Sequence, residues 1–558
     1  MRTLLACALL VGGLSLPASA AAPVYEVSYV TGTGGQTLRV EVLRDPAVKH
    51  APVILTLSPY NVLSDSKPAD NATARRYVSQ GYAVAVADVL GTRGSSGCWD
   101  YGGKREQQAG VDVVKWLAHR PWANGRVGMT GVSYDGTTAN MVAATGIPEL
   151  KAIAPVAAIS HWYGYAYYDG VRYSGNSRVP SDEGIDTPAA FDYGFARIPK
   201  VDPADPQLAG QLTTSAQDCQ GVEHTQQAYS RSPDYTAFWK ERDYVRAASK
   251  FRAAVFLVHG WQDYNVKQDE ALRLWNALPV GPGHVPFKRM WLTQESHADG
   301  TGPGYREALD RFWAATLRGP YQDPQIPMVT SLGADNVRRV STAWPPPAAH
   351  DTTLFLGRSF VHRPGVPSAV PDPAGAERED GTLSLDRTYD GAGWTYVDNG
   401  TSTEESSLAD PTQSNGLGTY SLFHQTPVLK RSVRLVGSAR LDAWVNPEVA
   451  GEHLTPLLVD VAQNGSLSLV ERGFLNLGYR GGLESDQSTA GWQRGVVTML
   501  PQDYTFAAGH RIGVVLQSSN TVWAIPGAAG TVEVAMGPVD GVTYVGTRLI
   551  LPLVGTLR

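Results

Sequence analysis

Cysteine is scarce in this sequence, with three residues in a chain of 558. Cys7 lies in the N-terminal segment, so Cys98 and Cys219 form the pair left in the rest of the chain. They are a disulfide candidate if the chain is exported, and spacing alone does not exclude two separate thiols. Length sets a further limit: 558 residues with 43% hydrophobic content can bury large cores, which excludes disorder and mini-protein scaffolds.

Positive charge is not in excess, because Lys and Arg total 47 against 53 Asp and Glu, a net charge of -6. We therefore expect no nucleic-acid partner and no polybasic membrane contact. Beyond the N-terminal segment, no apolar run reaches the roughly 18 residues of a membrane-spanning helix. An HExxH motif, paired CxxC motifs and a dinucleotide-binding fingerprint are also missing, so we expect neither a metal nor an organic cofactor.

The first twenty residues have the layout of a secretory signal peptide. Arg2 precedes an apolar run from Leu4 to Leu14, and Ala18 to Ala20 has the small residues of a cleavage site. Cys7 comes too early in the apolar run to favour a lipoprotein signal. We therefore expect a mature protein that begins near Ala21 and is secreted or periplasmic.

Short β-branched runs alternate with helical stretches in the N-terminal half, which is typical of a doubly wound α/β sheet. The pattern predicts strands at Leu38–Leu43, Val53–Leu57, Ala83–Val89, Val127–Val132, Ala254–His259 and Arg289–Thr293, and a helix at Glu106–His119. Residues 160–250 lose this rhythm, with helical pieces near Ala204–Ala216 and Thr225–Arg246. We interpret them as a cap inserted into an α/β domain made of residues 21–159 and 251–320.

After about Tyr321 the helical periodicity nearly disappears, and short strands follow one another between turn residues. These strands are predicted at Thr353–Leu356, Val433–Trp444, Thr455–Gln463, Arg511–Gln517 and Gly530–Ala535. The chain as a whole has 58 Gly and 37 Pro, which are the residues that tight turns require. We expect residues 321–558 to form a separate all-β sandwich or jelly roll.

The sharpest local motif runs from Gly131 to Gly136 and has the sequence GVSYDG. An apolar strand precedes it and a helix of small residues follows it, which is the context of a nucleophile elbow, a strained turn that exposes a serine. Asp135 stands where such motifs usually have glycine, so the pattern is a variant. A serine between glycines is more often structural, but these flanks favour Ser133 as a nucleophile.

A serine hydroxyl needs a base and an orienting acid, which in this type of sheet follow it in the order Ser, Asp, His. Asp263 comes just after the strand that ends at His259, at the carboxyl edge where α/β sheets build their sites. His297 lies in the loop after the next strand and is the candidate base. The alternative for Asp263 is a solvated turn carboxylate. A single histidine is a solvated loop residue unless the serine and the aspartate are also in register with it. His259 is predicted to lie in the core or behind the reacting groups.

Acyl transfer also needs two donors that face the developing oxyanion. The backbone amide of Tyr134, the residue after the candidate nucleophile, is one candidate. Tyr60 is the other, because it follows the strand Val53–Leu57 and Pro59 before it would fix the turn that points the phenol inward. On its own, a tyrosine after proline is more often a packed loop residue.

Five motifs, in this order along the chain, resemble the X-prolyl dipeptidyl peptidase and cocaine-esterase group of serine hydrolases. They are Ser58 to Tyr60, Asp88 to Gly97, Gly131 to Tyr134, His259 to Asp263, and Ser296 with His297. The resemblance covers nearly the whole mature chain and implies an α/β-hydrolase core with a helical cap and a C-terminal jelly-roll domain. It also implies a triad of Ser133, Asp263 and His297, with Tyr60 and the Tyr134 amide as the oxyanion hole.

Within this group, the segments Ala158–Tyr165 and Asp263–Lys267 are more similar to the proline-specific peptidases. That similarity implies a proline pocket lined by Trp162, Tyr165, Asn265 and Val266, and aromatic faces do bind a flat apolar ring well. The alternative is an aromatic cluster that packs the cap onto the sheet. A dipeptidyl enzyme must also hold a free α-amino group with a carboxylate, and Asp182 and Glu183 in the cap are the candidates, unless they are ordinary solvated loop residues.

The leading hypothesis is a secreted serine hydrolase that releases Xaa-Pro dipeptides through an acyl-enzyme. The alternative is a cocaine-esterase-like carboxylesterase, or an α-amino-acid ester hydrolase or acylase, with the same triad. A third hypothesis is a carbohydrate- or surface-binding protein with an aromatic platform in its β domain, made by Trp394, Tyr396, Trp444 and Trp492. The expected partner is a peptide or a small ester or amide, and the sequence leaves open whether the chain forms homo-oligomers.

Overall fold

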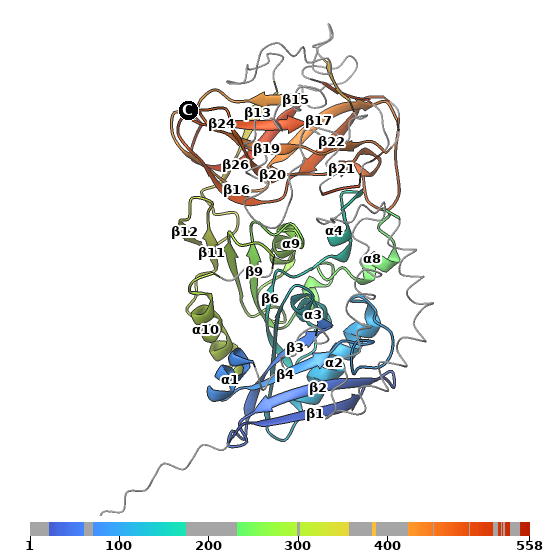
Figure 1. Ribbon diagram of the computed structural model, residues 1–558, viewed down its shortest axis with the longest axis vertical. Helices are drawn as coiled ribbons and strands as arrows, with labels where there is room; N and C mark the ends of the chain where they lie inside the picture. Colours follow the sequence, from blue (N-terminus) through green and yellow to red (C-terminus); the bar gives the residue numbers. More distant parts are fainter. Residues whose placement is uncertain are drawn as a thin grey trace, which may run out of the picture.

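An α/β body formed by the N-terminal half and a body of strands formed by the C-terminal part are stacked on one another (Figure 1). The structure is a computed structural model that describes residues 22–60, 71–173, 232–297, 302–356, 382–386, 422–449, 451–489, 491–516, 523–525, 527, 531–535 and 547–557. The predicted signal peptide lies outside these residues. Among the helices of the described residues, none is long and apolar enough to cross a membrane.

A ten-stranded sheet forms the centre of the α/β body. In spatial order its strands are β1 (Val24–Thr31), β2 (Thr37–Arg44), β4 (Ala83–Asp88), β3 (Ala51–Ser58), β5 (Ala123–Val132), β6 (Leu150–Val156), β9 (Ala254–Gly260), β10 (Lys288–Thr293), β11 (Val329–Leu332) and β12 (Arg338–Ser341). The strands from β4 to β11 are parallel, whereas β1, β2 and β12 pair antiparallel at the two edges. Each strand predicted for this part of the chain coincides with one of these.

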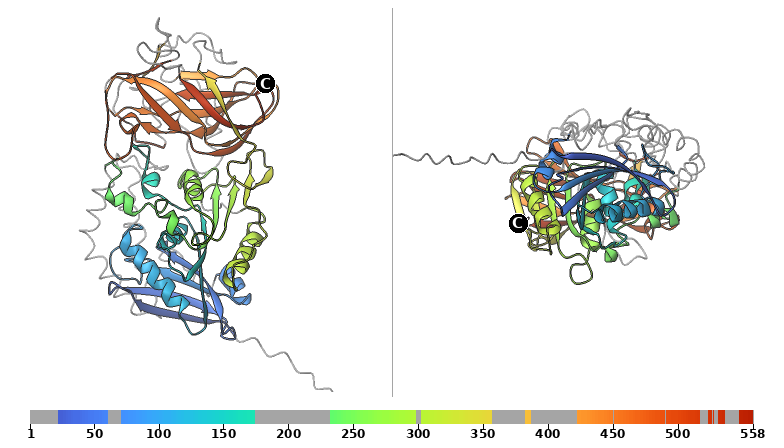
Figure 2. Two further views of the ribbon diagram at one scale, coloured as in Figure 1. Left: turned by 180° about the vertical axis from the view of Figure 1, so that it is seen from behind. Right: turned by 90° about the horizontal axis from the view of Figure 1, so that it is seen from below.

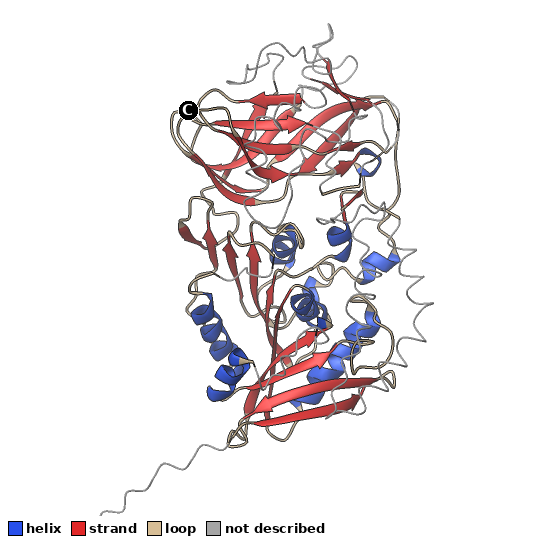
Figure 3. Cartoon of the chain, in the orientation of Figure 1, coloured by secondary structure: helices blue, strands red, loops and turns tan. Residues whose placement is uncertain are grey.

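Helices cover both faces of this sheet (Figure 3). They are α1 (Ala72–Ser79), α2 (Lys104–Ala118), α3 (Tyr134–Ala143), α9 (Asp269–Ala277) and α10 (Tyr305–Leu317). Leu117 of α2 and Met141 of α3 share one buried core, and Tyr77 of α1 and Trp313 of α10 share another. Because both faces are covered, seven of the eight residues of β3 are buried and its sequence does not alternate. The predicted α/β-hydrolase architecture is confirmed.

The sheet continues beyond residue 320, where we predicted the α/β domain to end. β11 pairs parallel with β10, and β12 pairs antiparallel with β11. These two strands form a hairpin with no helix between them. The alternation of strands and helices that marks the α/β domain in the sequence is therefore lost before the sheet itself ends.

The C-terminal body consists of two larger antiparallel sheets around an apolar core. The first contains β14 (Thr382–Asp386), β25 (Thr531–Ala535), β17 (Arg440–Pro447), β26 (Arg548–Val554), β16 (Val433–Gly437) and β23 (Gln502–Phe506), with β13 (His350–Phe355) on β26 and β22 (Gln493–Thr498) on β17. The second contains β15 (Leu422–Gln425), β24 (Arg511–Leu516), β19 (Leu457–Val461) and β20 (Leu467–Arg472). β18 (His453–Leu454) pairs with β21 (Leu475–Asn476), next to the short helix η4 (Leu477–Tyr479). The predicted all-β C-terminal architecture is confirmed.

One strand prediction in this body was wrong. The run Val433–Trp444 forms two strands, β16 and β17, because strand pairing is interrupted between Gly437, whose φ is 126°, and Arg440; both strands run antiparallel to β26, so the chain keeps its direction. Trp444 lies on β17, and Trp492 precedes β22, which pairs with β17. Trp394 and Tyr396 lie outside the described residues, so the aromatic platform stays a prediction.

The predicted cap, residues 160–250, is described at its two ends. The first end contains α4 (Trp162–Ala166), β7 (Tyr167–Tyr168) and β8 (Val171–Arg172), and the second contains α8 (Ala237–Glu241) and η3 (Ala248–Lys250). The helix predicted over Thr225–Arg246 is reduced to α8 within the described part, because Asp243 leaves the helix to bridge His161. The helix predicted near Ala204–Ala216 lies outside the described residues.

The β body rests on the end of the α/β sheet where β9 finishes, as the front and back views both show (Figure 2). Gln502 Nε2 donates a hydrogen bond to the backbone oxygen of Trp261, which follows β9, at 2.7 Å. Ser331 Oγ of β11 donates to Asp503 Oδ2 at 2.7 Å. Tyr264 packs against Trp523 with ring centroids 5.2 Å apart. The β body therefore braces the loop at the carboxyl end of β9.

The loop that follows β10 crosses the end of β9. Trp261 N donates to Thr293 O at 2.7 Å, and Gln262 N donates to Glu295 O at 3.2 Å. Gly260 permits this crossing, because a Cβ built on it would lie 2.0 Å from the Glu295 carbonyl oxygen. The loop runs on to His297, so the absence of a side chain at residue 260 sets how closely His297 can approach β9.

Gly260→Ala is expected to lower the free energy of unfolding by about 1 to 3 kcal/mol, the usual range for overpacking, because the clashing atom belongs to the backbone. Denaturant unfolding followed by tryptophan fluorescence measures this. Gly319→Ala is the matched control, since a Cβ there meets nothing within 4 Å, and a change within about 0.5 kcal/mol is expected. Equal stability of the two variants would contradict the close approach at residue 260.

Candidate active site

Ser133 lies in the sharp turn between β5 and α3. Its φ of 62° and ψ of -124° lie outside the helical and extended regions, a strain that persists only where the surroundings hold it. Ser133 N donates to Val156 O at 2.9 Å, and Ser133 O accepts from the amides of Gly136 and Thr137 at 3.1 and 2.9 Å. These bonds maintain the geometry that a nucleophile elbow requires.

Small residues flank this turn because its two sides touch. A Cβ on Gly131 would lie 2.3 Å from the Cβ of Asp135, and a Cβ on Gly136 would lie 2.9 Å from that of Ala158. The turn accepts Asp135 in place of the usual glycine because Gly131 leaves room for its side chain. Burial raises the pKa of the Asp135 carboxyl to about 7, although a hydrogen bond with Ser58 acts in the opposite direction.

Ser133, His297 and Asp263 come together from three different loops. His297 Nε2 lies 2.9 Å from Ser133 Oγ, and His297 Nδ1 lies 2.9 Å from Asp263 Oδ2. Because an ionised carboxylate can only accept hydrogen bonds, Nδ1 carries the ring proton and Nε2 is free to accept the serine proton. This is the arrangement in which an imidazole removes a proton from a serine hydroxyl.

Asp263 is fully buried, yet it is held ionised. Its Oδ1 accepts hydrogen bonds from the backbone amides of Asn265 and Val266 at 3.1 and 3.0 Å. Burial alone would raise the pKa of Asp263, but the charge of His297 and the hydrogen bonds from His259 and His297 outweigh it, so the pKa lies below its usual value. A fixed negative charge therefore orients the His297 ring.

His259, which the sequence placed only in the core or behind the reacting groups, contacts Asp263 directly. His259 Nε2 lies 3.4 Å from Asp263 Oδ2 and 2.8 Å from Val266 O. Burial lowers the pKa of His259. Its hydrogen bond to Asp263 and the negative charge of that residue raise the pKa by more than burial lowers it, so the pKa of His259 lies above its ordinary value. The four-residue spacing between His259 and Asp263 at the end of one strand was the signal that could have revealed this contact.

Tyr60 and the backbone amide of Tyr134 converge beside Ser133. Tyr60 Oη lies 3.4 Å from Ser133 Oγ and 3.3 Å from Tyr134 N. Burial raises the pKa of Tyr60 to about 12, with a smaller upward contribution from Asp135, so the phenol keeps its proton at neutral pH and can donate. Tyr60 Oη donates to Ser133 Oγ and accepts from the Tyr134 amide, so both predicted oxyanion donors lie next to the serine oxygen.

The four residues predicted to line a proline pocket lie near these groups in different ways. Tyr165 Oη donates to Asn265 Oδ1 at 3.2 Å, and Asn265 is partly exposed. Trp162 is buried edge-on against Tyr134 and Tyr165, and its Nε1 donates to Tyr244 Oη at 3.1 Å. The side chain of Val266 is buried in the core of the α/β body. The burial of Trp162 and Val266 is explained by packing alone. That any of the four residues contacts substrate stays a prediction.

Several predicted residues fall outside the described part of the chain. Asp182 and Glu183, the candidates for binding an α-amino group, are among them, and so is Cys219. Cys98 is disulfide-bonded. The pairing of Cys98 with Cys219 therefore stays a prediction.

Taken together, the geometry is suited to acyl transfer. It provides a hydroxyl on a strained turn, an imidazole within hydrogen-bonding distance, a buried acid that orients this imidazole, and two donors beside the hydroxyl. Each component sits at or just beyond the carboxyl end of a strand of one parallel sheet.

Comparisons with known proteins agree with this geometry. Residues 34–299 match the family model described as X-Pro dipeptidyl-peptidase (S15 family), and residues 321–534 match the X-Pro dipeptidyl-peptidase C-terminal non-catalytic domain. A Streptomyces avermitilis protein provisionally named an Xaa-Pro dipeptidyl-peptidase is 30% identical over 507 residues, which are 86% of this chain and 68% of that one. A Bacillus cereus protein with the same provisional name is 28% identical over 535 residues, 88% of this chain and 84% of that one.

The fold is shared with a solved α-amino acid ester hydrolase. That structure aligns with a TM-score of 0.70 and 18% identity over 98% of this chain and 100% of the other. At this identity the likeness bears on the fold alone. The sequence matches over both halves decide the family: the chain belongs to the S15 family of X-Pro dipeptidyl-peptidases and is a serine hydrolase.

Proposed function

We propose that the protein is an Xaa-Pro dipeptidyl-peptidase in which Ser133 is the nucleophile, His297 the general base and acid, and Asp263 the orienting carboxylate. The observation that carries the proposal is the unbroken chain of contacts from Asp263 through His297 to Ser133, at 2.9 Å for each step, beside two converging donors. Family membership and the names of the relatives support proline as the residue before the cleaved bond.

The reaction follows from this geometry. Ser133 Oγ attacks the prolyl carbonyl while His297 Nε2 takes the hydroxyl proton, and Tyr60 with the Tyr134 amide stabilises the oxyanion. His297 then gives the proton to the leaving amine as the carbon–nitrogen bond breaks, which leaves the dipeptide as an ester on Ser133. Water attacks this ester with His297 again as base, releasing the dipeptide and restoring the serine.

Export is a further part of the proposal. It is supported by the apolar run from Leu4 to Leu14 and the small residues Ala18 to Ala20. Asp182 and Glu183 remain our candidates for the carboxylate that holds the substrate's α-amino group, and Trp162, Tyr165, Asn265 and Val266 remain candidates for the proline pocket.

The purified protein is expected to release p-nitroaniline from Ala-Pro-p-nitroanilide and to lose this activity when the substrate's α-amine is acetylated. Chromophore release measures both, with p-nitrophenyl butyrate as the ester comparison. Turnover of the ester with none of the anilide would keep the serine chemistry and refute the peptidase assignment. It would favour the esterase or acylase alternative.

Ser133→Ala is expected to lower kcat by on the order of 10⁶-fold, as loss of a triad serine does elsewhere, because the acyl-enzyme cannot form. Labelling by a fluorophosphonate should disappear in the same variant. Residual labelling or near-normal turnover would show that a different residue is the nucleophile.

Tyr60→Phe is expected to lower kcat by about 10² to 10³-fold with little change in KM, because one oxyanion donor is lost while the ring remains. Steady-state kinetics measure the two constants separately. Tyr321→Phe is the matched control: its phenol donates to the Lys151 carbonyl at 2.9 Å, near the amino end of β6, whereas Ser133 follows the carboxyl end of β5, and kcat should not change. A rise in KM alone for Tyr60→Phe would assign Tyr60 to substrate binding instead.

A further inference from the structure

Behind the oxyanion donors, the phenol of Tyr134 is held in a buried polar network. Trp99 Nε1 donates to Tyr134 Oη at 2.8 Å. Tyr134 Oη donates in turn to both carboxylate oxygens of Glu106 at 2.9 Å. Because the indole can only donate and the phenol has a single proton, the direction of the chain is fixed from Trp99 through Tyr134 to Glu106.

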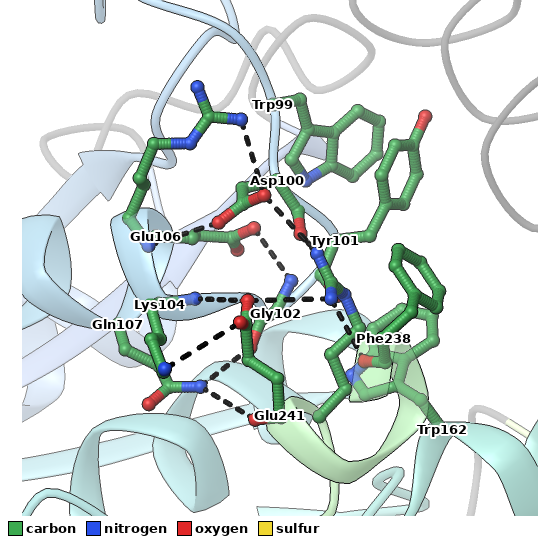
Figure 4. A network of polar contacts seen from close by, with 12 residues as sticks. Trp99, Asp100, Tyr101, Gly102, Lys104, Glu106, Gln107, Trp162, Phe238 and Glu241 are labelled. Atoms are coloured by element: carbon green, nitrogen blue, oxygen red, sulfur yellow. Dashed lines mark hydrogen bonds and ion pairs between the residues drawn. The ribbon is translucent and has the colours of Figure 1, made fainter. Parts of the chain in front are cut away.

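A second chain of hydrogen bonds meets the same carboxylate. Trp162 Nε1 donates to Tyr244 Oη at 3.1 Å, and Tyr244 Oη donates to Gly102 O at 2.9 Å. Gly102 N then donates to Glu106 Oε2 at 2.9 Å, the contact drawn between the two residues in Figure 4. The approach needs glycine, since a Cβ on Gly102 would lie 2.1 Å from Tyr244 Oη. Glu106 thus connects the nucleophile turn with the loop at residues 99–103.

This loop is itself held firmly. The buried Arg242 donates from Nε to Tyr101 O at 3.1 Å, and from one terminal nitrogen to Asp100 O and Oδ1 at 2.9 and 3.2 Å. Trp99, Asp100, Tyr101 and Gly102 of this loop are labelled in Figure 4. Cys98, just before the loop, is disulfide-bonded. These bonds hold the loop in place, and with it the two groups that donate to Tyr134 and Glu106, which are Trp99 Nε1 and Gly102 N.

The amide of Tyr134 imposes a particular demand on its surroundings. In this structure the amide donates to Tyr60 Oη at 3.3 Å, and it must give up this contact to donate to an oxyanion, so this bond cannot fix its position through the reaction. The side chain is the part of Tyr134 that can be fixed without occupying the amide. A buried carboxylate is costly unless it is hydrogen-bonded, and Glu106, which is fully buried, receives its hydrogen bonds from Tyr134 and Gly102.

We propose that Glu106 is a positioning residue for the oxyanion hole: its carboxylate holds the Tyr134 side chain and thereby places the Tyr134 backbone amide beside Ser133. The inference rests on the proposed function, since it takes this amide as an oxyanion donor. Glu106 itself does not touch the reacting atoms.

The ionisation of Glu106 should make the activity depend on pH. Burial raises the pKa of Glu106 to about 7, and the charge of Asp100 adds to the rise. Hydrogen bonds from Gly102 and Tyr134 and the charge of Arg242 act in the opposite direction. The remaining titratable neighbour, Tyr244, keeps its proton, because burial raises its pKa well above 10. Below about pH 7 a protonated Glu106 loses acceptor capacity toward Tyr134 and Gly102.

The decisive variant is Glu106→Gln, assayed with Ala-Pro-p-nitroanilide, or with p-nitrophenyl butyrate if the ester is the substrate turned over. We expect kcat to fall by about 10 to 100-fold, less than the loss of an oxyanion donor outright, with KM changed by less than about threefold. Below about pH 7, wild-type kcat should fall more steeply than kcat of the variant, because Asp135, whose pKa is also about 7, is common to both proteins and Glu106 is not. Glu471→Gln, the same change at a buried glutamate of β20 in the β body, should leave kcat unchanged.

Tyr134→Phe keeps the amide and removes the phenol proton, so it should lower kcat by a similar factor and make the fall of kcat below about pH 7 equally shallow. The double variant should be no worse than either single variant. If Glu106→Gln fails to fold, Tyr134→Phe carries the test by itself.

Stability provides an independent readout. The pKa of Glu106 in the folded protein lies above its ordinary 4.5, so ionised Glu106 costs stability, and this cost grows as the pH rises from about 5 to above 7. The stability of Glu106→Gln relative to wild type should therefore improve over that range, while its kcat stays low.

Three results would overturn the proposal. They are an unchanged kcat in Glu106→Gln, a fall of kcat below about pH 7 that is as steep in both single variants as in the wild type, and losses that add fully in the double variant. A purely structural role would lower the active fraction, counted by fluorophosphonate titration, and leave the pH profile of the remaining enzyme as it was. Full activity in Ser133→Ala would instead refute the proposed function, which keeps the two failures distinct.

Discussion

The strained backbone at Ser133 depends on the structure around it. A residue at φ 62° and ψ -124° is stable only if its neighbours are fixed on both sides. β5 pairs in parallel with β6 on one side, and the amide of Ser133 bonds to Val156 at the end of β6. α3 begins directly after Ser133 and packs on β5, β6 and β3. The elbow is therefore a consequence of the sheet order, and the other reacting groups arrive at the same edge because their strands are parallel neighbours.

Three buried carboxyl groups surround this one serine, and their environments give them different pKa values. The pKa of Asp263 is lowered because the imidazoles of His297 and His259 face it. The pKa values of Asp135 and Glu106 are raised to about 7, because burial dominates in both. Only the first environment suits a group that must stay ionised beside a histidine through the reaction. The second kind of environment is costly for stability, and Glu106 retains it next to Tyr134, whose amide we propose as an oxyanion donor.

The β body contributes to the site through the loop that carries Asp263. Gln502 bonds to the carbonyl of Trp261, and Tyr264 packs against Trp523. The guanidinium of Arg472 lies over both rings, 4.2 Å from the centroid of Tyr264 and 4.5 Å from that of Trp523. On the other side of the loop, the buried Lys267 donates to the Tyr165 carbonyl at 2.9 Å and lies 3.8 Å from the centroid of the Tyr173 ring. A loop held from both bodies can keep a buried acid in place without a rigid helix or strand of its own.

The sequence was sufficient to predict the strand positions, the two oxyanion candidates, and the chain order of Ser133, Asp263 and His297. Each of these depends on patterns within a dozen residues and on the known direction of parallel strands. The sequence did not predict the hairpin β11–β12, since no helix marks it, or the break at Gly437, where one apolar run serves two strands. The contacts of His259 with Asp263 and of Glu106 with Tyr134 were decided by tertiary structure alone. Glu106 reads as one polar residue near the start of a helix, and only the packing of α2 against α3 and the loop at residues 99–103 buries it against the nucleophile turn. Local sequence thus determined which residues could react, and the packing of distant segments decided how their charges and backbone are held.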